Sequence, residues 1–180
     1  MSLPGENVLE NPLCKLALAD GTVVTGSAVG FHGETGGELC FNTSMTGYQE
    51  IFSDPSYHGQ IMMMTYPHIG NYGASDDDME ALKPMVSGVV VRSFSHRFSN
   101  QHRSQSLDDF MKLHQLVGIS GIDTRALVLH IREKGVMNAV ISSVDLDDDS
   151  LVSKARNWPS MDGLELASRV TVEKTYDFAT

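Results

Sequence analysis

Five short apolar runs, separated by turns, fill the first half of this 180-residue chain and constrain its fold more than any other feature. Each run is five to eight residues long, which is typical of a β-strand. Asp20-Gly21 between the first two runs is a common hairpin turn, and Gly33, Gly36 and Gly37 are expected to break the chain before the third. We therefore predict strands over 13–19, 22–29, 38–42, 60–66 and 87–92.

Helix-capping signals are concentrated in the second half of the chain. Ser106 precedes an apolar helical pattern, with Asp109 at capping-box spacing, and Asp123 precedes another. Asp147 or Asp148 begins a third. The predicted elements are a helix over 107–116, a strand over 117–122, a helix through Lys134 that Gly135 ends, a strand over 137–142, a helix from 147 or 148 with Pro159 after it, and a short helix near 164–168. This order favours an α+β fold, specifically a layered β/β/α domain.

Composition excludes several classes of function. A formal net charge of −10 argues against nucleic-acid binding, which needs clustered Lys and Arg. No apolar run is long enough to span a membrane and no secretory leader is evident, so a cytoplasmic location is expected. Cys14 and Cys40 lie in apolar, strand-like contexts and are predicted to be buried thiols. Met62-Met63-Met64 is assigned to core packing, because neighbouring strand residues point to opposite faces.

The segment 41–73 is long, polar and poor in full charges. Its hydroxyl and amide side chains suit fixed hydrogen bonds to a ligand or to a neighbouring domain. Within it, Asp54-Pro55-Ser56 predicts a turn, in which Ser56 either satisfies local amides or is held rigidly for a polar ligand. His58 and His68 flank the same region. The segment is therefore the first candidate for a functional surface.

No self-sufficient catalytic set is evident. The chain has no G-x-S-x-G elbow, no phosphate-binding loop and no histidine pair at metal-ligand spacing, so no catalytic residue and no metal site are predicted. Arg125 and Arg132 lie two helical turns apart. We assign them to a solvated or partner-facing stripe in preference to an anion site. A serine hydrolase built on Ser56 and His58 is disfavoured, because the two are close in sequence and only Asp54 is available as an orienting acid.

Several ordered motifs resemble the amino-terminal domain of the small subunit of glutamine-dependent carbamoyl phosphate synthetase. They are LADGTVVTGSAVG, FNTSMTGYQEI, DPSY, TYPHIGNYG, SGVVVRSFSHRFSN, GIDTRAL with REKG, and MNAVI. The resemblance runs from about Leu13 to Thr180. An acidic loop over 75–80 and an extra segment over 4–11 depart from the family pattern without disturbing a motif.

The resemblance implies a non-catalytic domain. In the family, a second domain with a Cys nucleophile and a His/Glu pair hydrolyses glutamine, and its residues have no counterpart here. The ammonia passes to a large subunit, which makes carbamoyl phosphate from bicarbonate and ATP, with Mg²⁺ or Mn²⁺, for pyrimidine and arginine synthesis. The expected partners are that domain and that subunit; no cofactor is expected in this chain. Ser56 matches the family serine that contacts glutamine. The supporting or interface candidates are Asn42, Thr43, Ser44, Tyr48, Gln49, Tyr57, His68 and Asn71.

The implied organisation has three parts. Residues 1–12 are an amino-terminal extension, in which residues 1–3 are a candidate remnant of cloning, 13–170 form the domain, and 171–180 begin a linker. The alternative is an independent module that binds a small amide through the 41–73 segment.

Overall fold

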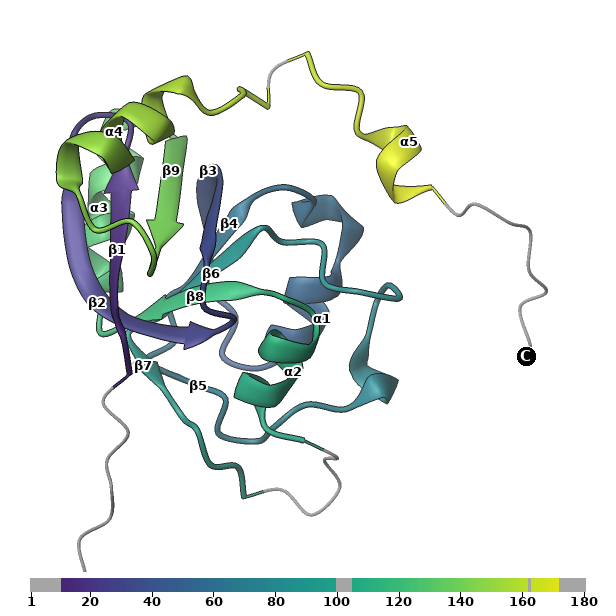
Figure 1. The fold of residues 1–180 in the computed structure, drawn as a ribbon. Helices are drawn as coiled ribbons and strands as arrows, with labels where there is room; N and C mark the ends of the chain where they lie inside the picture. The colour runs from purple at the N-terminus through teal and green to yellow at the C-terminus, as the bar shows by residue number, and fades with distance from the viewer. Residues whose placement is uncertain (1–10, 100–104, 162, 172–180) are drawn as a thin grey trace, which may run out of the picture.

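The computed structural model describes residues 11–99, 105–161 and 163–171 of the chain (Figure 1). The expected extension up to residue 10 and the expected linker from residue 172 lie outside this range. The strands are β1 (Leu13–Leu18), β2 (Val23–Gly30), β3 (Glu34–Asn42), β4 (Ile61–Met64), β5 (His68–Ile69), β6 (Gly88–Val90), β7 (Ser93–Phe94), β8 (Val117–Ser120) and β9 (Met137–Ser142). The helices are α1 (Tyr48–Ser53), α2 (Leu107–Leu113), α3 (Thr124–Lys134), α4 (Asp148–Asn157) and α5 (Ala167–Val170), with 3-10 helices η1 (Pro55–Tyr57) and η2 (Asp76–Asp78). The α+β class predicted from the sequence is confirmed.

The strands close into a barrel in the order β1-β2-β8-β6-β4-β3-β9, with β9 returning to β1. Pairs along β1, β2 and β9 are antiparallel, whereas β3-β4, β4-β6 and β6-β8 are parallel. β5 and β7 form a separate small parallel sheet. Closure gives every barrel strand two partners, so the barrel presents no free strand edge.

Alternating side chains divide the core between the inside and the outside of the barrel. One cluster takes Leu16, Met63, Val90 and Ile141 from four strands, together with residues from α3. The residues next to these in sequence, such as Met62 and Met64, join a second cluster with α1 and α2. Burying one such side chain contributes about 1.5–3 kcal/mol. The Met triplet is thus core, as predicted from the alternation of a strand.

A third cluster fixes α4 on the outside of the barrel (Figure 1). Leu151 and Ala155 of the helix, with Trp158 after it, pack on Ala17 and Val140 of the facing strands. Asp147 caps this helix by accepting a hydrogen bond from the Ser150 amide at 2.8 Å. Lys154 holds the helix to the start of β3 through Glu34, at 2.7 Å.

Both cysteines are free thiols, as expected. Cys14 is fully buried and Cys40 is partly buried. Burial raises the pKa of each to about 12. Neither thiol is therefore a candidate nucleophile at neutral pH.

The prediction that Gly36 and Gly37 break the chain before the third strand is wrong, since β3 begins at Glu34. These two glycines lie inside the strand and allow other parts of the chain to approach it closely. A Cβ on Gly36 would lie 2.4 Å from the Trp158 ring, and one on Gly37 would lie 2.4 Å from the carbonyl oxygen of Gly59. The absence of a side chain thus lets the ring and the loop pack directly on the strand.

The helix predicted over 107–116 ends three residues early. Ser106 caps it as predicted, accepting a hydrogen bond from the Asp109 amide at 3.0 Å. Gln115 then adopts a φ of 55°, which stops the helix and turns the chain into β8. A left-handed residue that is not glycine leaves no clear stop signal in the sequence.

We predict that Gly36→Ala destabilises the fold by about 1–3 kcal/mol, because the new methyl group overlaps the Trp158 ring. Denaturant unfolding measures the loss. The matched control is the same substitution in a Trp158→Ala background, where the cost should be clearly smaller. Additive costs in the double variant would show that the ring contact is not the cause.

Candidate functional site

The 41–73 segment does not form a single loop, since it leaves the end of β3 and returns to add the parallel strand β4 to the barrel. After β3 it exposes Thr43, Ser44, Met45 and Thr46, with Met45 71% exposed. It then forms α1, η1, β4 and β5. The segment therefore combines an exposed polar stretch with elements that are anchored in the core.

Two tyrosines from opposite ends of the segment hold α1 in place. The Tyr72 hydroxyl accepts hydrogen bonds from the amides of Gly47, at 2.8 Å, and Tyr48, at 3.1 Å. The Tyr48 hydroxyl donates in return to the Gly73 carbonyl at 2.7 Å. The two rings stack with their centroids 4.1 Å apart. Tyr72 thus caps a helix start that carries no Ser, Thr, Asp or Asn at the N-cap.

Buried polar side chains of α1 extend this attachment. The Gln49 side chain is fully buried, and it donates to the Ser75 carbonyl while accepting from the Ser75 amide at 2.9 Å. The Ser53 hydroxyl, also buried, accepts from the Glu80 amide at 3.0 Å. Every one of these bonds links α1 to the segment that follows β5. Tyr48 and Gln49, singled out as supporting or interface candidates, therefore lie inside the domain as supports.

Ser56 lies on an exposed turn at the surface beyond α1. The Asp54 carboxylate accepts a hydrogen bond from the Ser56 amide at 2.8 Å, which confirms the predicted turn. The Asn42 amide donates to the Tyr57 hydroxyl at 3.2 Å and ties η1 to the end of β3. The backbone around Ser56 is thus held from both sides, and its side chain faces solvent.

His58, directly after η1, has an unusual environment. Its Nδ1 atom and the Oε2 atom of Glu50 are buried without a hydrogen-bond partner among the described residues. Burial, and next the charges of Arg169 and Lys83, hold the pKa of His58 below 6.5. A catalytic base needs an acid on one ring nitrogen, and Nδ1 has none within the described structure. The geometry thus disfavours a serine hydrolase here.

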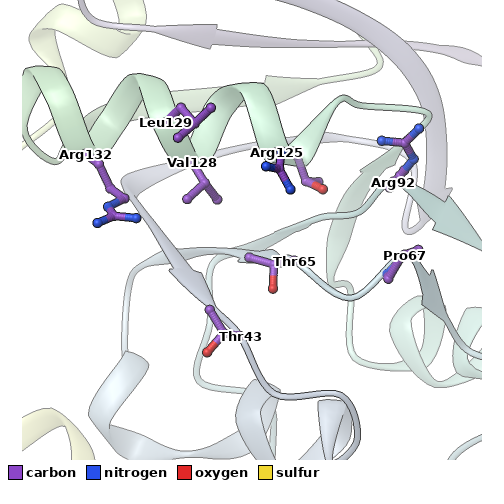
Figure 2. Close-up of a pocket in the computed structure, with 9 residues that line it drawn as sticks. Thr43, Thr65, Pro67, Arg92, Arg125, Val128, Leu129 and Arg132 are labelled. Carbon is purple, nitrogen blue, oxygen red and sulfur yellow. The ribbon is translucent and has the colours of Figure 1, made fainter.

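The other candidates lie around this region without forming one cluster. Thr43 and Ser44 are exposed after β3, and the Ser44 amide donates to the Asn42 side chain at 2.8 Å. His68 and Asn71 are exposed on and after β5. Thr43 also faces a groove under α3 (Figure 2). Arg92 on that groove was missed by sequence reasoning, since nothing local marks it.

Two classes of site find no support in the described part of the chain. No group of three or more His, Cys, Asp or Glu side chains there could hold a metal ion. No described helix is both long and apolar enough to cross a membrane.

The fold and site together define a class: an α+β barrel domain with a polar surface segment that is anchored in the core. Residues 16–141 match the family model "Carbamoyl-phosphate synthase small chain, CPSase domain". The chain therefore belongs to the carbamoyl-phosphate synthase small-chain family.

Curated relatives agree with this assignment. The chain is 55% identical over 161 residues to the carbamoyl phosphate synthase small chain of Syntrophotalea carbinolica and 53% identical over 161 residues to that of Aquifex aeolicus. Each match covers 89% of this chain but only 43% of the relative. A small chain of Thermotoga maritima is 50% identical over 87% of this chain and 40% of its own length. The chain thus spans less than half the length of these relatives.

One solved structure shows a weak similarity to this chain. An aminopeptidase from Aneurinibacillus sp. strain AM-1 aligns over 73% of this chain and 31% of its own, with a TM-score of 0.39 and 17% identity.

Replacing Tyr72 by Phe should cost about 1–2 kcal/mol, because two backbone donors at the start of α1 lose their shared acceptor. Hydrogen exchange at the Gly47 and Tyr48 amides should accelerate more than exchange in the barrel strands. Tyr66→Phe removes a hydroxyl from another ring packed on the same core and serves as the control. An equal effect in both variants would contradict the capping role.

The pKa of His58, followed by NMR titration, should lie below 6.5. Neutral His58 contributes fully to the free energy of unfolding above pH 6.5. This contribution decreases as the pH falls through the folded-state pKa, because protonation then favours the unfolded chain. Arg169→Gln should raise this pKa only in part, since burial is the larger cause. Arg125→Gln, on α3, should leave it unchanged. A pKa at or above 6.5 in the parent would refute the assignment.

Proposed function

We propose that this chain is the non-catalytic part of a glutamine-dependent carbamoyl phosphate synthetase small subunit. Its task is to support glutamine hydrolysis by a separate glutaminase domain and delivery of ammonia to a large subunit. The large subunit would join ammonia to bicarbonate with ATP and Mg²⁺ or Mn²⁺, and the product would feed pyrimidine and arginine synthesis. This domain contributes surface and substrate contact but no catalytic group.

The observation that carries the proposal is the placement of Ser56. Its hydroxyl group is exposed on a turn whose backbone is fixed by Asp54 and by the link between Asn42 and Tyr57. Such a hydroxyl can bond a polar substrate with little loss of conformational freedom. Among the described residues, none forms a hydrogen bond with the Ser56 hydroxyl that would mark it as a nucleophile, so we assign it to binding glutamine.

Ser56→Ala in the complete enzyme should lower glutamine-dependent synthesis about 2- to 12-fold, the effect of one lost hydrogen bond. Synthesis from free ammonia should be unchanged, because that route bypasses the glutamine site. Steady-state assays with each nitrogen source measure the two rates. Ser153→Ala, at an exposed serine of α4, is the matched control.

Equal loss with both nitrogen sources would contradict the assignment of Ser56. Sub-millimolar binding of glutamine by the 180-residue chain alone, measured by calorimetry, would instead favour an independent amide-binding module. Glutamine hydrolysis by that chain would contradict the non-catalytic role itself.

A further inference from the structure

Three arginines, Arg92, Arg125 and Arg132, line a groove between α3 and the chain that follows β3 and β4 (Figure 2). The groove has a volume of about 510 Å³, which is within the usual range of small-molecule sites. No acidic side chain is among the described residues that line it. The groove thus gathers positive charge in a chain whose formal net charge is −10.

The arginines lie at two ends of the groove. Arg125 is in the first turn of α3, and Arg92 lies beside the start of that helix, where its guanidinium group is 3.9 Å from the carboxylate of Asp123. Arg132 is in the last turn of the same helix. Arg125 and Arg132 are seven residues apart in sequence, so they share a face of the helix and lie about 10 Å apart along its axis.

The middle of the groove is less polar than its ends, and a second wall faces the helix. Val128 and Leu129 lie between the two helix arginines in sequence; Val128 is half-buried and Leu129 is 57% exposed. Thr43 and Thr65 form part of the opposite wall, and their hydroxyl groups can donate hydrogen bonds to an anion. This wall is what the structure adds to the solvated stripe favoured by the sequence, because a molecule in the groove contacts protein on two sides.

The two helix arginines can bind a ligand without losing an internal partner. Within the described residues, neither Arg125 nor Arg132 forms a hydrogen bond or an ion pair. Arg92 has a long ion pair with Asp123. Phosphate or carboxylate groups placed against Arg125 and Arg132 would therefore gain charge-assisted, bidentate hydrogen bonds.

A single small anion does not match this arrangement. One inorganic phosphate cannot reach both Arg125 and Arg132, since about 10 Å separates them along the helix axis. The start of α3 already has an acidic cap, because Asp123 accepts a hydrogen bond from the Ala126 amide at 3.1 Å. A molecule with one anionic group at each end and a less polar body between them matches both arginines and the apolar residues that separate them.

We propose that this groove binds a small organic dianion, whose two phosphate or carboxylate groups are held by Arg125 and Arg132. The body of the ligand lies over Val128 and Leu129. Arg92 adds positive charge at the Arg125 end of the groove. Neither glutamine nor Ser56 takes part in this binding.

Isothermal titration calorimetry of the 180-residue chain with hexane-1,6-diol bisphosphate tests the site. This probe carries two phosphate groups on an apolar chain, and we expect sub-millimolar binding that weakens as the salt concentration rises. Arg125→Gln and Arg132→Gln should each weaken binding about 10- to 150-fold, the effect of one lost hydrogen-bonded contact to a charged group. Lys134→Gln removes the same charge from the last turn of α3 but outside the groove, and it is the matched control. All three positions are exposed, and thermal melts check that each variant folds.

Two further probes define the ligand class. Octanedioate carries carboxylates in place of phosphates, so the tighter of the two dianions identifies the anionic group. Inorganic phosphate should bind at least about 10-fold more weakly than the bisphosphate, because it reaches one helix arginine alone.

Three results would overturn the proposal. They are equal affinity for inorganic phosphate and the bisphosphate, equal loss of binding in Lys134→Gln and the two arginine variants, and no binding of either dianion at millimolar concentration. Because the experiment uses no glutamine, each of these results leaves the assignment of Ser56 unaffected.

Discussion

Pairing between β1 and β9 closes the barrel, and the positions of all other elements depend on this closure. It joins the first strand to the last, across more than a hundred residues of intervening chain. Closure creates one interior, which Leu16, Met63 and Ile141 fill, and an outer surface on which the helices pack. At the end of the barrel where β3 and β4 finish, Thr43 and Thr65 then face α3 across a groove.

The paired contacts of Tyr48 and Tyr72 fix the surface that the 41–73 segment forms on this barrel. Tyr72 caps α1, Tyr48 returns a bond to Gly73, and Gln49 holds Ser75. The residues are twenty or more positions apart, so the bonds form only once the core has brought both stretches together. What they achieve for function is rigidity: the turn bearing Ser56 directly follows α1 and inherits its position.

Local signals were sufficient for much of the fold. Asp123 and Gly135 bound α3 as predicted, Ser106 begins α2, and the alternation of the Met triplet placed its members on both faces of a strand. Prediction failed where the cause is distant in sequence. Gly36 is inside a strand because Trp158 packs on it, and α1 begins without a local cap because Tyr72 supplies one.

The candidate site likewise combines features that local sequence predicts with features that depend on distant contacts. The turn at Asp54 and Ser56 is encoded by adjacent residues, and the family motifs are visible in the sequence. The residues next to Tyr48 and Gln49 in sequence do not indicate that these side chains point into the core. Polar side chains are exposed by default, and their burial needs hydrogen-bond partners from elsewhere in the chain. The grouping of Arg92 with Arg125 and Arg132 is likewise a product of folding.

The sequence by itself determined the α+β class, the bounds of α3 and β9, the turn at Ser56 and membership of the family, because each depends on contacts within a few residues or on ordered motifs. Tertiary structure alone decided the closure of the barrel, the capping of α1 by a remote tyrosine and the arginine groove. Each of these joins groups that are far apart along the chain, and only the burial of a shared core brings them within the reach of a hydrogen bond or a charge.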